Sequence, residues 1–577
     1  MDMRLLIAFL ALSLLPAQAQ DAEDALSKLA GRGGVACITR AELWPQALKA
    51  AANPRWVVHM IVEDEARAAA LQDEGSESGR LGRNLYVTQA DPAHLPHADH
   101  LLDLLIADEK TPREEALRVI SPIRGRAFVG DEVLSKPAIE GSGWWTHRAH
   151  GPDNNPAATD TAFRLPAILQ FAAMPFYSSF HGSHLIKDGL RVELYDWEIK
   201  RASGRRKLAG KVLARSLYNG QVVWKRDLPE AIKPDAPICA LFRDAILLAD
   251  AEPGRVLAFD MATGNPLDPI EPVDGEDRYV TWLGVDGTRL FLLLADRDWP
   301  RIQVTSFGRP ARRPGEAPEK GSLPPPEQVI GSTIVCWDLE AGEMLWRHDE
   351  PAPIDFRVVG VREGRTYFFS DETRLACLDR DGSLAWENRD REWLDKLRTK
   401  RFIRIVNIRN SSSLIIGKDT LVFAPASGIT ERQAMGFGFA LKDGRLLWSK
   451  DHRFPPVKAA FPGDGRLWVA GNAFDPQSFE KQWVEKEYET RFGHCGYWSW
   501  VPDVGMVGHL SFTFKNPCAI PTIAAGGVLS YFPTVCNCSG HTRGAAGYVA
   551  SAGVVERAEN EPGHPLVTGK QRPQKDG

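Results

Sequence analysis

The sequence Thr333–Trp346, TIVCWDLEAGEMLW, combines a strand-like run, a tight turn ending in Gly342, and a tryptophan four residues after that glycine. The same turn and tryptophan recur at Gly220 and Trp224, at Gly382 and Trp386, and at Gly444 and Trp448. A fifth copy around Gly264 keeps the turn but has Asp268 at the tryptophan position. Successive glycines are 44, 78, 40 and 62 residues apart. A spacing of about 40 to 45 residues, taken once or twice, is that of a β-propeller blade.

Each copy is expected to form a β-hairpin. Apolar residues alternate on both sides of the turn, and glycine supplies the positive φ that the turn needs. A tryptophan at one fixed place after each turn then packs on the neighbouring hairpin, so the contact repeats around a ring. Radial repetition of small sheets protects their edge strands. The length of residues 144–551 suits seven or eight blades of about 50 residues each.

The repeat resembles the tryptophan-docking repeat of PQQ-like β-propellers, A-x-D-x-x-T-G-x-x-x-W, of which Ala258–Gly264 is the closest copy. The stretch Trp144–Asn155, WWTHRAHGPDNN, is similar to the start of the propeller in a family of large exported bacterial proteins of planctomycete type. The surroundings of Cys495, Cys518 and Cys536–Cys538 also match that family. The resemblance implies a PQQ-like propeller preceded by a methyltransferase-like domain, and it implies architecture rather than an activity.

The expected organisation is therefore multidomain. We expect a signal peptide over residues 1–19, a degenerate methyltransferase-like α/β domain of Rossmann-like fold over 25–140, and an all-β, seven- or eight-bladed PQQ-like propeller over 144–551. The Pro- and Arg-rich stretch 306–328 is expected to be a surface loop inserted into the propeller. Residues 556–577 are polar and are expected to form a disordered tail.

Strand-like and helical runs alternate through residues 25–140, which predicts a parallel sheet with crossover helices. Strands are expected at 34–38, 55–62, 84–87, 101–106 and 126–129, and helices at 41–52, 64–73 and 111–119. Methyltransferases of this fold carry a glycine-rich loop after the first strand, where the backbone approaches the cofactor. Here that place holds Thr39–Pro45 without a glycine. Glu63 and Asp64 end the second strand, where an acid normally holds a ribose. We therefore favour a structural domain over one that binds S-adenosylmethionine.

The N-terminus has the pattern of a signal peptide. Arg4 precedes an apolar run, Leu5–Leu15, that is too short to span a membrane, and Ala17-Gln18-Ala19 is an A-x-A cleavage site. We expect cleavage near Ala19 and a periplasmic or secreted protein without a membrane span. The formal net charge of −5 lacks the basic balance that nucleic-acid binding requires. The sequence does not indicate an oligomeric state.

The eight cysteines fall into two groups. Cys37, Cys239, Cys336 and Cys377 lie singly in apolar runs and are expected to be buried thiols. Cys495, Cys518, Cys536 and Cys538 lie within 44 residues, and export favours two disulfides among them. A one-residue spacer strains a bridge, so Cys536 and Cys538 are each expected to pair with one of the other two. A thiolate-bound metal is the alternative, and free or mixed thiols are the third possibility.

Polar residues at the start of the propeller form the candidate site: His147, His150, Asn154, Asn155, His181 and His184. If they line the central channel, the imidazoles suit metal binding or general-base work. The amide oxygens, together with the carboxylate of Asp160, suit calcium. The alternative is that they are ordinary hydrogen-bonded or turn-forming residues. The vicinal Cys-Cys pair that the resemblance to quinoprotein dehydrogenases would require does not occur in the chain.

A propeller without a complete catalytic set is expected to work by binding. The first hypothesis is a scaffold or interaction module in the periplasm or cell envelope, with a protein or glycan partner. The second, implied by the resemblance, is an oxidoreductase of the quinoprotein dehydrogenase type that uses PQQ, calcium or a thiolate-bound metal. A methyltransferase is the third.

Overall fold

The computed structural model describes residues 33–550 with internal gaps. The gaps are 174–176, 179–183, 201–203, 229–238, 251–253, 274–277, 297–303, 306–329, 371–372, 399–405, 408–412, 426–434, 452–453, 455–457, 483–497, 509–520 and 533–543. The chain divides into two compact units, unit 1 within Met1–Ala138 and Arg215–Trp224, and unit 2 within Ile139–Ala214 and Lys225–Gly577. The expected signal peptide (1–19), inserted loop (306–328) and tail (556–577) lie outside the described residues.

A mixed six-stranded sheet forms the centre of unit 1. Its strands are β1 (Gly34–Ile38), β2 (Trp56–Val62), β3 (Leu85–Gln89), β4 (Leu104–Ala107), β5 (Arg126–Val129) and β6 (Glu132–Leu134). They lie in the order β3-β2-β1-β4-β5-β6, and every neighbouring pair is parallel except β5 with β6. The five predicted strands are present, and the antiparallel β6 makes the sheet mixed rather than parallel.

Helices pack on both faces of this sheet. They are the short 3-10 helix η3 (Ala41–Leu43), α3 (Trp44–Ala51), α4 (Glu65–Glu77) and α5 (Arg113–Val119). Alternate residues of each central strand face two separate apolar clusters, as the period of a strand requires. Ile38 and Met60 belong to the cluster under α3 and α4, whereas Cys37 and Ile61 belong to the cluster under α5. Among the described residues, no helix is long and apolar enough to cross a membrane.

Unit 1 also contains the turn that carries the first repeated glycine. The side-chain amide of Asn219 donates to the Leu101 carbonyl at 2.9 Å and to Oδ2 of Asp103 at 2.7 Å. The same carboxylate oxygen accepts from the Val35 amide at 2.9 Å. Burial raises the pKa of Asp103, and these hydrogen bonds oppose the rise. The turn is thereby fixed by a buried polar cluster.

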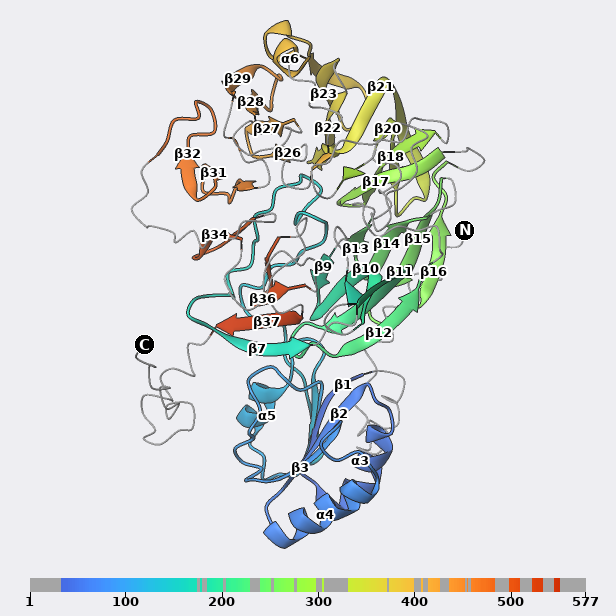
Figure 1. Cartoon of the computed structure of the whole chain (residues 1–577), viewed down its shortest axis with the longest axis vertical. Coiled ribbons are helices and arrows are strands. Elements are labelled where there is room, and N and C mark those ends of the chain that lie inside the picture. Colours follow the sequence, from blue (N-terminus) through green and yellow to red (C-terminus); the bar gives the residue numbers. More distant parts are fainter. Residues whose placement is uncertain are drawn as a thin grey trace. The chain divides into compact units, whose positions relative to one another are not determined.

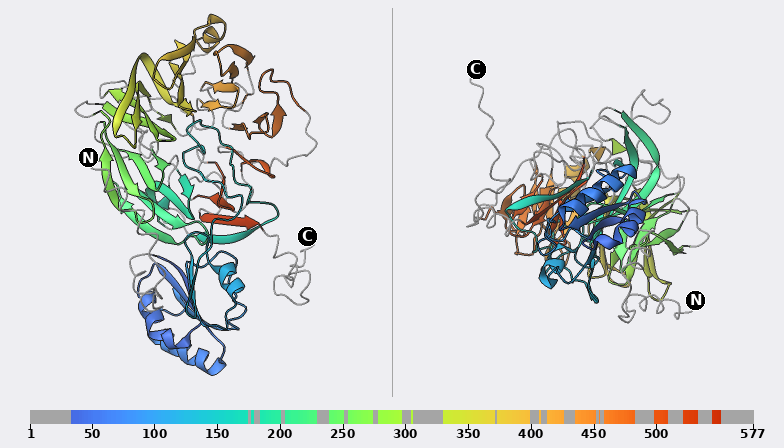
Figure 2. Two further views of the ribbon diagram at one scale, coloured as in Figure 1. Left: turned by 180° about the vertical axis from the view of Figure 1, so that it is seen from behind. Right: turned by 90° about the horizontal axis from the view of Figure 1, so that it is seen from below.

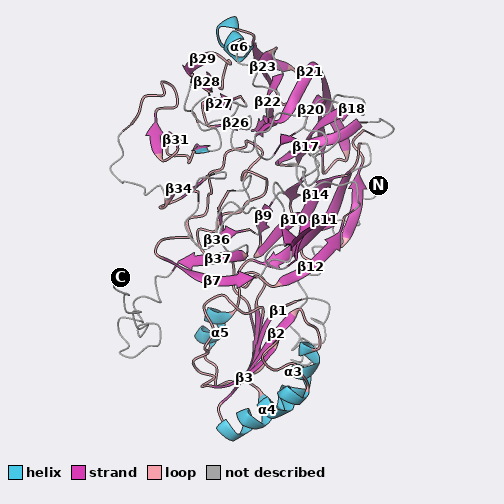
Figure 3. Ribbon diagram, in the orientation of Figure 1, coloured by secondary structure: helices cyan, strands magenta, loops and turns pink. Residues whose placement is uncertain are grey.

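Most of the remaining structure is β-sheet. The strands after β6 are β7 (Ala167–Ala173), β8 (Tyr177–Ser178), β9 (His184–Lys187), β10 (Leu190–Lys200), β11 (Gly204–Ser216), β12 (Val222–Asp227), β13 (Cys239–Phe242), β14 (Ala245–Ala249), β15 (Val256–Asp260), β16 (Pro266–Ile270), β17 (Arg278–Asp286), β18 (Arg289–Asp296), β19 (Val304–Thr305), β20 (Ile330–Asp338), β21 (Glu343–Arg362), β22 (Arg365–Ser370), β23 (Arg374–Leu378), β24 (Leu384–Asn388), β25 (Val406–Asn407), β26 (Ser413–Ile416), β27 (Thr420–Ala424), β28 (Gly436–Ala440), β29 (Leu446–Lys450), β30 (Ala459–Ala460), β31 (Leu467–Val469), β32 (Asn472–Phe474), β33 (Ser499–Val501), β34 (Gly505–Val507), β35 (Ile523–Ala525), β36 (Val528–Tyr531) and β37 (Ala545–Ala550). One further helix, α6 (Arg391–Arg398), lies among them (Figure 3).

Apart from β19 and β25, which form a short parallel pair, these strands form successive antiparallel groups. The groups are β8–β12, β13–β16, β17-β18-β20-β21, β21–β24, β26–β29, β30–β32, β33-β34, and β35–β37 with β7. The long strand β21 belongs to two groups, which are therefore joined in one seven-stranded sheet. The described strands thus give eight groups, and Figures 1 and 2 show them arranged as a ring. The sequence predicts seven or eight blades without deciding between the two numbers.

The ring is closed by strands from its two chain ends. β7, near the start of unit 2, pairs antiparallel with β37, the last described strand, over Ala167–Ala173 and Ala545–Ala550. This pairing completes the eighth group with a strand that comes before the first group in the sequence. The cysteines predicted to tie the end of the ring together, Cys495, Cys518, Cys536 and Cys538, lie outside the described residues.

Trp346 and Trp386 dock on the next repeated turn, as predicted. All five turn glycines have positive φ, between 69° and 82°. Trp346 donates through Nε1 to the Arg380 carbonyl at 2.9 Å, and Trp386 donates to the Leu441 carbonyl at 3.0 Å. Each of these acceptors belongs to the next repeated turn along the chain. A Cβ added to Gly444 would lie 2.3 Å from the ring of Trp386, so the turn needs glycine for close approach as well as for its φ.

Candidate functional site

The segment of residues 143–160, which we name the axial segment, runs across the middle of the ring (Figure 1). Its polar groups contact β9 in the first group and, in each other group, the first strand or the residue or two that follow it. The contacted positions, in order, are Ile186, Leu241, Val285, Val359 with Val361, Ile416, Phe461, Trp500, and Gly526 with Gly527. Because the first strand of a group has no partner on its inner side, its backbone needs these hydrogen bonds. The axial segment therefore fills the centre of the ring.

Backbone groups of the axial segment make many of these contacts. Trp145 exchanges two hydrogen bonds with Ile186, at 2.9 and 2.7 Å, and the Thr146 carbonyl accepts from Leu241 at 3.0 Å. The Pro152 carbonyl accepts from Val361 at 2.8 Å, and Ala158 donates to Trp500 at 2.8 Å. The segment thus passes from the first group to the seventh in chain order without forming a regular strand.

His147 is one of these anchors. Its Nε2 accepts a hydrogen bond from the Val285 amide at 2.9 Å, so the proton of the neutral ring is on Nδ1, which lies 2.9 Å from the Thr146 hydroxyl. Burial lowers the pKa of His147 to about 3. Both ring nitrogens are therefore occupied, and neither is free to bind a metal or accept a proton.

His150 lies close to His147, across a β-bridge. Its φ is +71°, and its Nε2 is 3.4 Å from the Thr159 hydroxyl. The edge of its ring meets Trp145, with the two ring centroids 5.3 Å apart. Burial lowers the pKa of His150 to about 4. This environment holds a neutral, packed imidazole.

The two candidate asparagines also bind backbone. Asn154, at φ +56°, donates through Nδ2 to the Val359 carbonyl at 2.7 Å. Asn155 mimics a strand, because its Nδ2 donates to the Phe461 carbonyl at 2.8 Å and its Oδ1 accepts from the Phe461 amide at 2.9 Å. The Asn154 nitrogen and both amide atoms of Asn155 thus connect two different sheet groups to the segment.

Asp160 ends the axial segment as a buried acceptor of three backbone hydrogen bonds. Its Oδ2 accepts from Gly143 at 3.0 Å and from Gly527 at 2.9 Å, and its Oδ1 accepts from Phe163 at 2.8 Å. The side chain is fully buried. Burial raises its pKa and the backbone donors oppose that rise. The carboxylate connects the two ends of the segment to the eighth group.

The remaining candidates lie elsewhere. His184 is buried on β9, and its ring stacks on Phe532 with centroids 4.0 Å apart. Burial lowers the pKa of His184 to about 3. His181 lies outside the described residues. His147, His150, Asn154 and Asn155 thus all lie in the axial segment. Their contacts are made with the segment itself and with several different sheet groups, and they do not meet at one ligand site.

A quinone or calcium ion at the centre of the ring does not fit these residues. The polar groups of the axial segment are engaged in hydrogen bonds to all eight sheet groups. Calcium takes six to eight oxygen ligands, but the Asn155 and Asp160 oxygens face backbone N–H groups instead. Within the described ranges, no group of three or more His, Cys, Asp and Glu side chains is placed to hold a metal.

The described cysteines agree with the expected buried thiols. Cys37, Cys239, Cys336 and Cys377 are buried and free, and burial raises the pKa of each. Cys336 pairs with Trp346 in register, and Cys377 pairs with Trp386 in the same way. Equivalent positions opposite the docking tryptophans indicate a packing role.

Unit 1 does not provide a cofactor loop at the end of β1. Residues Ala41–Leu43 form η3, and Trp44, the first residue of α3, is buried. Glu63 pairs with Lys110, and Asp64 caps α4 by accepting from the Arg67 amide at 2.7 Å. Both acids at the position expected to hold a ribose are thus engaged within the fold, and the residues do not fit S-adenosylmethionine.

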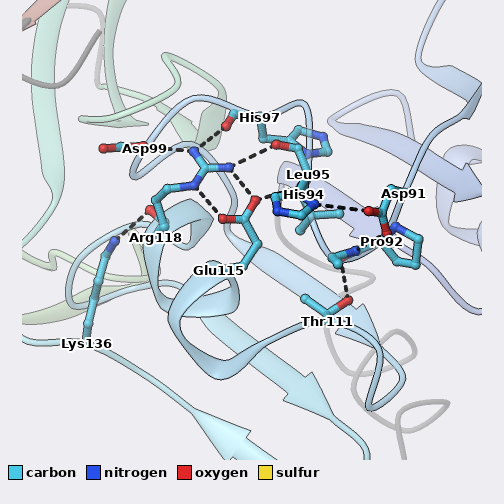
Figure 4. A network of polar contacts seen from close by, with 11 residues as sticks. Asp91, Pro92, His94, Leu95, His97, Asp99, Thr111, Glu115, Arg118 and Lys136 are labelled. Atoms are coloured by element: carbon cyan, nitrogen blue, oxygen red, sulfur yellow. Dashed lines mark hydrogen bonds and ion pairs between the residues drawn. The ribbon is translucent and has the colours of Figure 1, made fainter. Parts of the chain in front are cut away.

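A polar network fixes the loop after β3 against α5 (Figure 4). Arg118 donates to the carbonyls of His97 at 2.7 Å and Leu95 at 2.9 Å, and it forms ion pairs with Asp99 and Glu115. Glu115 in turn accepts from the Leu95 amide at 2.7 Å. Because its members bind one another and the backbone, we interpret this network as structural.

A cleft of about 530 Å³, which we name the turn cleft, opens between the fourth and fifth sheet groups. Its basic side chains are Arg362, Arg365, Arg380, Lys418 and Lys442, and its acidic side chains are Glu363, Asp379 and Asp419. They come from the turns β21–β22 and β26–β27 and from the residues after β23 and β28. The sheets thus place charged residues that are distant in sequence around one opening.

Half of the charges in the turn cleft are paired. Arg365 binds both oxygens of Asp379 at 3.3 Å, and the hydrogen bond from the Arg380 amide, together with this contact, lowers the pKa of Asp379. Arg362 lies 3.6 Å from Glu363. Lys418 and Lys442 are exposed and have no ion pair among the described residues. The cleft is therefore basic overall, although the whole chain has a net charge of −5.

Sequence reasoning missed the turn cleft. A basic residue precedes Asp-Gly in two successive repeats, at Arg380-Asp381-Gly382 and Lys442-Asp443-Gly444. This pattern was the available signal, because equivalent turns of neighbouring blades lie side by side. Arg362 and Lys418 also line the cleft, but no comparable sequence pattern marks their positions.

Comparisons with known proteins address the ring. Residues 329–472, a quarter of the chain, match the family model described as "Outer membrane protein assembly factor BamB". No curated protein matches the chain. The ring is similar at low level to a europium-containing methanol dehydrogenase, with 11% identity, a TM-score of 0.33, and coverage of 63% of this chain and 67% of that one. It is also similar to the quinohemoprotein alcohol dehydrogenase from Comamonas testosteroni, with 11% identity, a TM-score of 0.35, and coverage of 59% and 52%. This chain spans about half the length of the second enzyme.

Proposed function

We propose that this protein is an exported scaffold or interaction module that binds an envelope protein through its ring. The observation that carries the proposal is the use of the axial segment. The polar residues best suited to catalysis at the ring centre, His147, Asn154, Asn155 and Asp160, are all hydrogen-bonded to backbone. The turn cleft, in contrast, presents two exposed lysines, Lys418 and Lys442, that form no ion pair within the part of the chain that the structure describes.

The family match supports the same proposal. The matched range 329–472 contains every residue of the turn cleft. The description of that family concerns assembly at the outer membrane, which accords with the predicted signal peptide and a periplasmic or secreted location. We propose that the α/β unit is a degenerate, methyltransferase-like domain with a structural or binding role. Its strand order accords with a Rossmann-like fold.

The experiment is isolation of the tagged, full-length protein from its own cell envelope after brief chemical crosslinking. We expect one or a few envelope proteins to be recovered in amounts comparable to the bait, and to be absent with an unrelated exported protein that carries the same tag. Recovery of the bait alone in repeated preparations would contradict the proposal.

The enzyme hypothesis has a separate test. If the axial segment fills the ring, adding PQQ and Ca²⁺ to the purified protein should produce neither heat of binding in calorimetry nor dye-linked oxidation of alcohols or sugars. Saturable binding near one equivalent, together with turnover, would overturn the scaffold account.

A further inference from the structure

We propose that the turn cleft is a binding site for an acidic peptide segment, one rich in aspartate and glutamate, of the partner protein. This inference rests on the proposed function and names the chemistry of the partner. The cleft holds five basic side chains against three acidic ones. The charge of the cleft is thus opposite in sign to the net charge of the chain, so the cleft attracts anionic ligands locally.

Arg380, Lys418 and Lys442 are the basic side chains of the cleft that form no ion pair among the described residues, and of these Arg380 donates to the Glu363 carbonyl. Arg365 is held by Asp379 through both carboxylate oxygens, and Arg362 lies within 4 Å of both Glu363 and Asp153. Lys418 and Lys442 lack such partners among the residues that the structure describes, and they lie on two neighbouring turns. A ligand carboxylate between them would gain two cations without breaking an existing pair.

The form of the cleft favours a peptide over a small anion. A volume of about 530 Å³ exceeds the space that one phosphate or carboxylate fills. The wall also contains the partly buried Leu441, which offers apolar surface to side-chain or backbone carbon atoms. Asp419, the acidic residue of the lining that has no ion pair among the described residues, provides an acceptor for a peptide N–H group. Mixed apolar and charged lining is typical of peptide-binding surfaces.

The test measures binding of a fluorescein-labelled oligoglutamate peptide to the full-length protein by fluorescence anisotropy at low ionic strength. We expect saturable binding, and none of an oligoglutamine peptide. Lys418→Glu/Lys442→Glu should weaken binding by at least about tenfold, because two attractions become repulsions. Lys418→Arg/Lys442→Arg should keep affinity within about threefold, since the charges remain.

The matched control is Lys450→Glu/Lys481→Glu. It makes the same charge change at two exposed lysines outside the cleft, so affinity should change by less than about twofold. Equal losses in the two glutamate variants, or no binding to the unmodified protein, would overturn the proposal. Displacement of the peptide by equimolar inorganic phosphate would assign a small-anion site, and stronger binding of polygalacturonate than of the peptide would assign a glycan site.

The result of the peptide-binding test can be distinguished from the result of the crosslinking test of the proposed function. If an envelope partner is crosslinked but the peptide does not bind, the scaffold stands and the cleft assignment fails. If the peptide binds as expected but no partner is recovered, the cleft stands and the scaffold role fails.

Discussion

Replacing Trp386 with alanine is expected to lower the free energy of unfolding by about 3–5 kcal/mol, the usual loss for a buried large aromatic side chain. The side chain of Trp386 is only 9% exposed, and its indole packs on the turn of the next sheet group at Gly444. Its Nε1 also donates to the Leu441 carbonyl at 3.0 Å, so the substitution leaves that carbonyl without its partner. The lost contacts join two successive groups of the ring. Trp346→Ala should behave in the same way, through its contact with Gly382.

The measurement is equilibrium denaturation of the purified variant and of Leu384→Ala as a matched control. Leu384 lies on the same strand as Trp386 but is 48% exposed, so its loss should change stability by less than about 1 kcal/mol. If Trp386→Ala unfolds at the same denaturant concentration as the control, the tryptophan does not carry the contact between groups.

Replacing Asp160 with alanine is expected to have a comparable effect, about 3–5 kcal/mol. Three backbone N–H groups, of Gly143, Phe163 and Gly527, would lose their acceptor in a buried site, and each unsatisfied group costs about 1–3 kcal/mol. Removing the buried carboxylate offsets part of that loss. Asp160→Asn keeps one acceptor oxygen, so its stability should be intermediate.

Chemical denaturation at neutral pH measures the free energy of unfolding of the unmodified protein, Asp160→Asn and Asp160→Ala, and stability is expected to fall in that order. Asp268→Ala, at an exposed position of the ring, is the control and should leave stability nearly unchanged. An Asp160→Ala variant as stable as the unmodified protein would mean that the axial segment is not held at this end.

The repeated part of the fold could be predicted from the sequence, because its signals are local. A glycine at positive φ and a tryptophan four residues later determine one hairpin and its contact with the next. The strands and helices of unit 1 were equally predictable, since alternation of apolar residues reports which face of each strand is buried. Cys336 and Cys377 were placed at equivalent positions for the same reason.

The axial segment could not be predicted, because its contacts are long-range and it lacks periodicity. Asn155 binds a residue 306 positions away, and Asp160 binds one 367 positions away. From sequence alone, a cluster of His and Asn residues indicates a ligand site as readily as a set of backbone anchors. The structure favours the second interpretation because the inner strand of each group exposes N–H and C=O groups that need partners. The pairing of β7 with β37 was missed for the same reason.

The central claim is that residues 143–160 pack inside the ring and connect its sheet groups. Hydrogen exchange followed by mass spectrometry on the intact protein tests it most directly. The amides of Trp145 and Ala158 donate to Ile186 and Trp500. We therefore predict exchange at least about a thousandfold slower than in an unprotected chain, as slow as in the strands themselves. Exchange of this segment at the rate of an exposed loop, while the strands stay protected, would contradict the account.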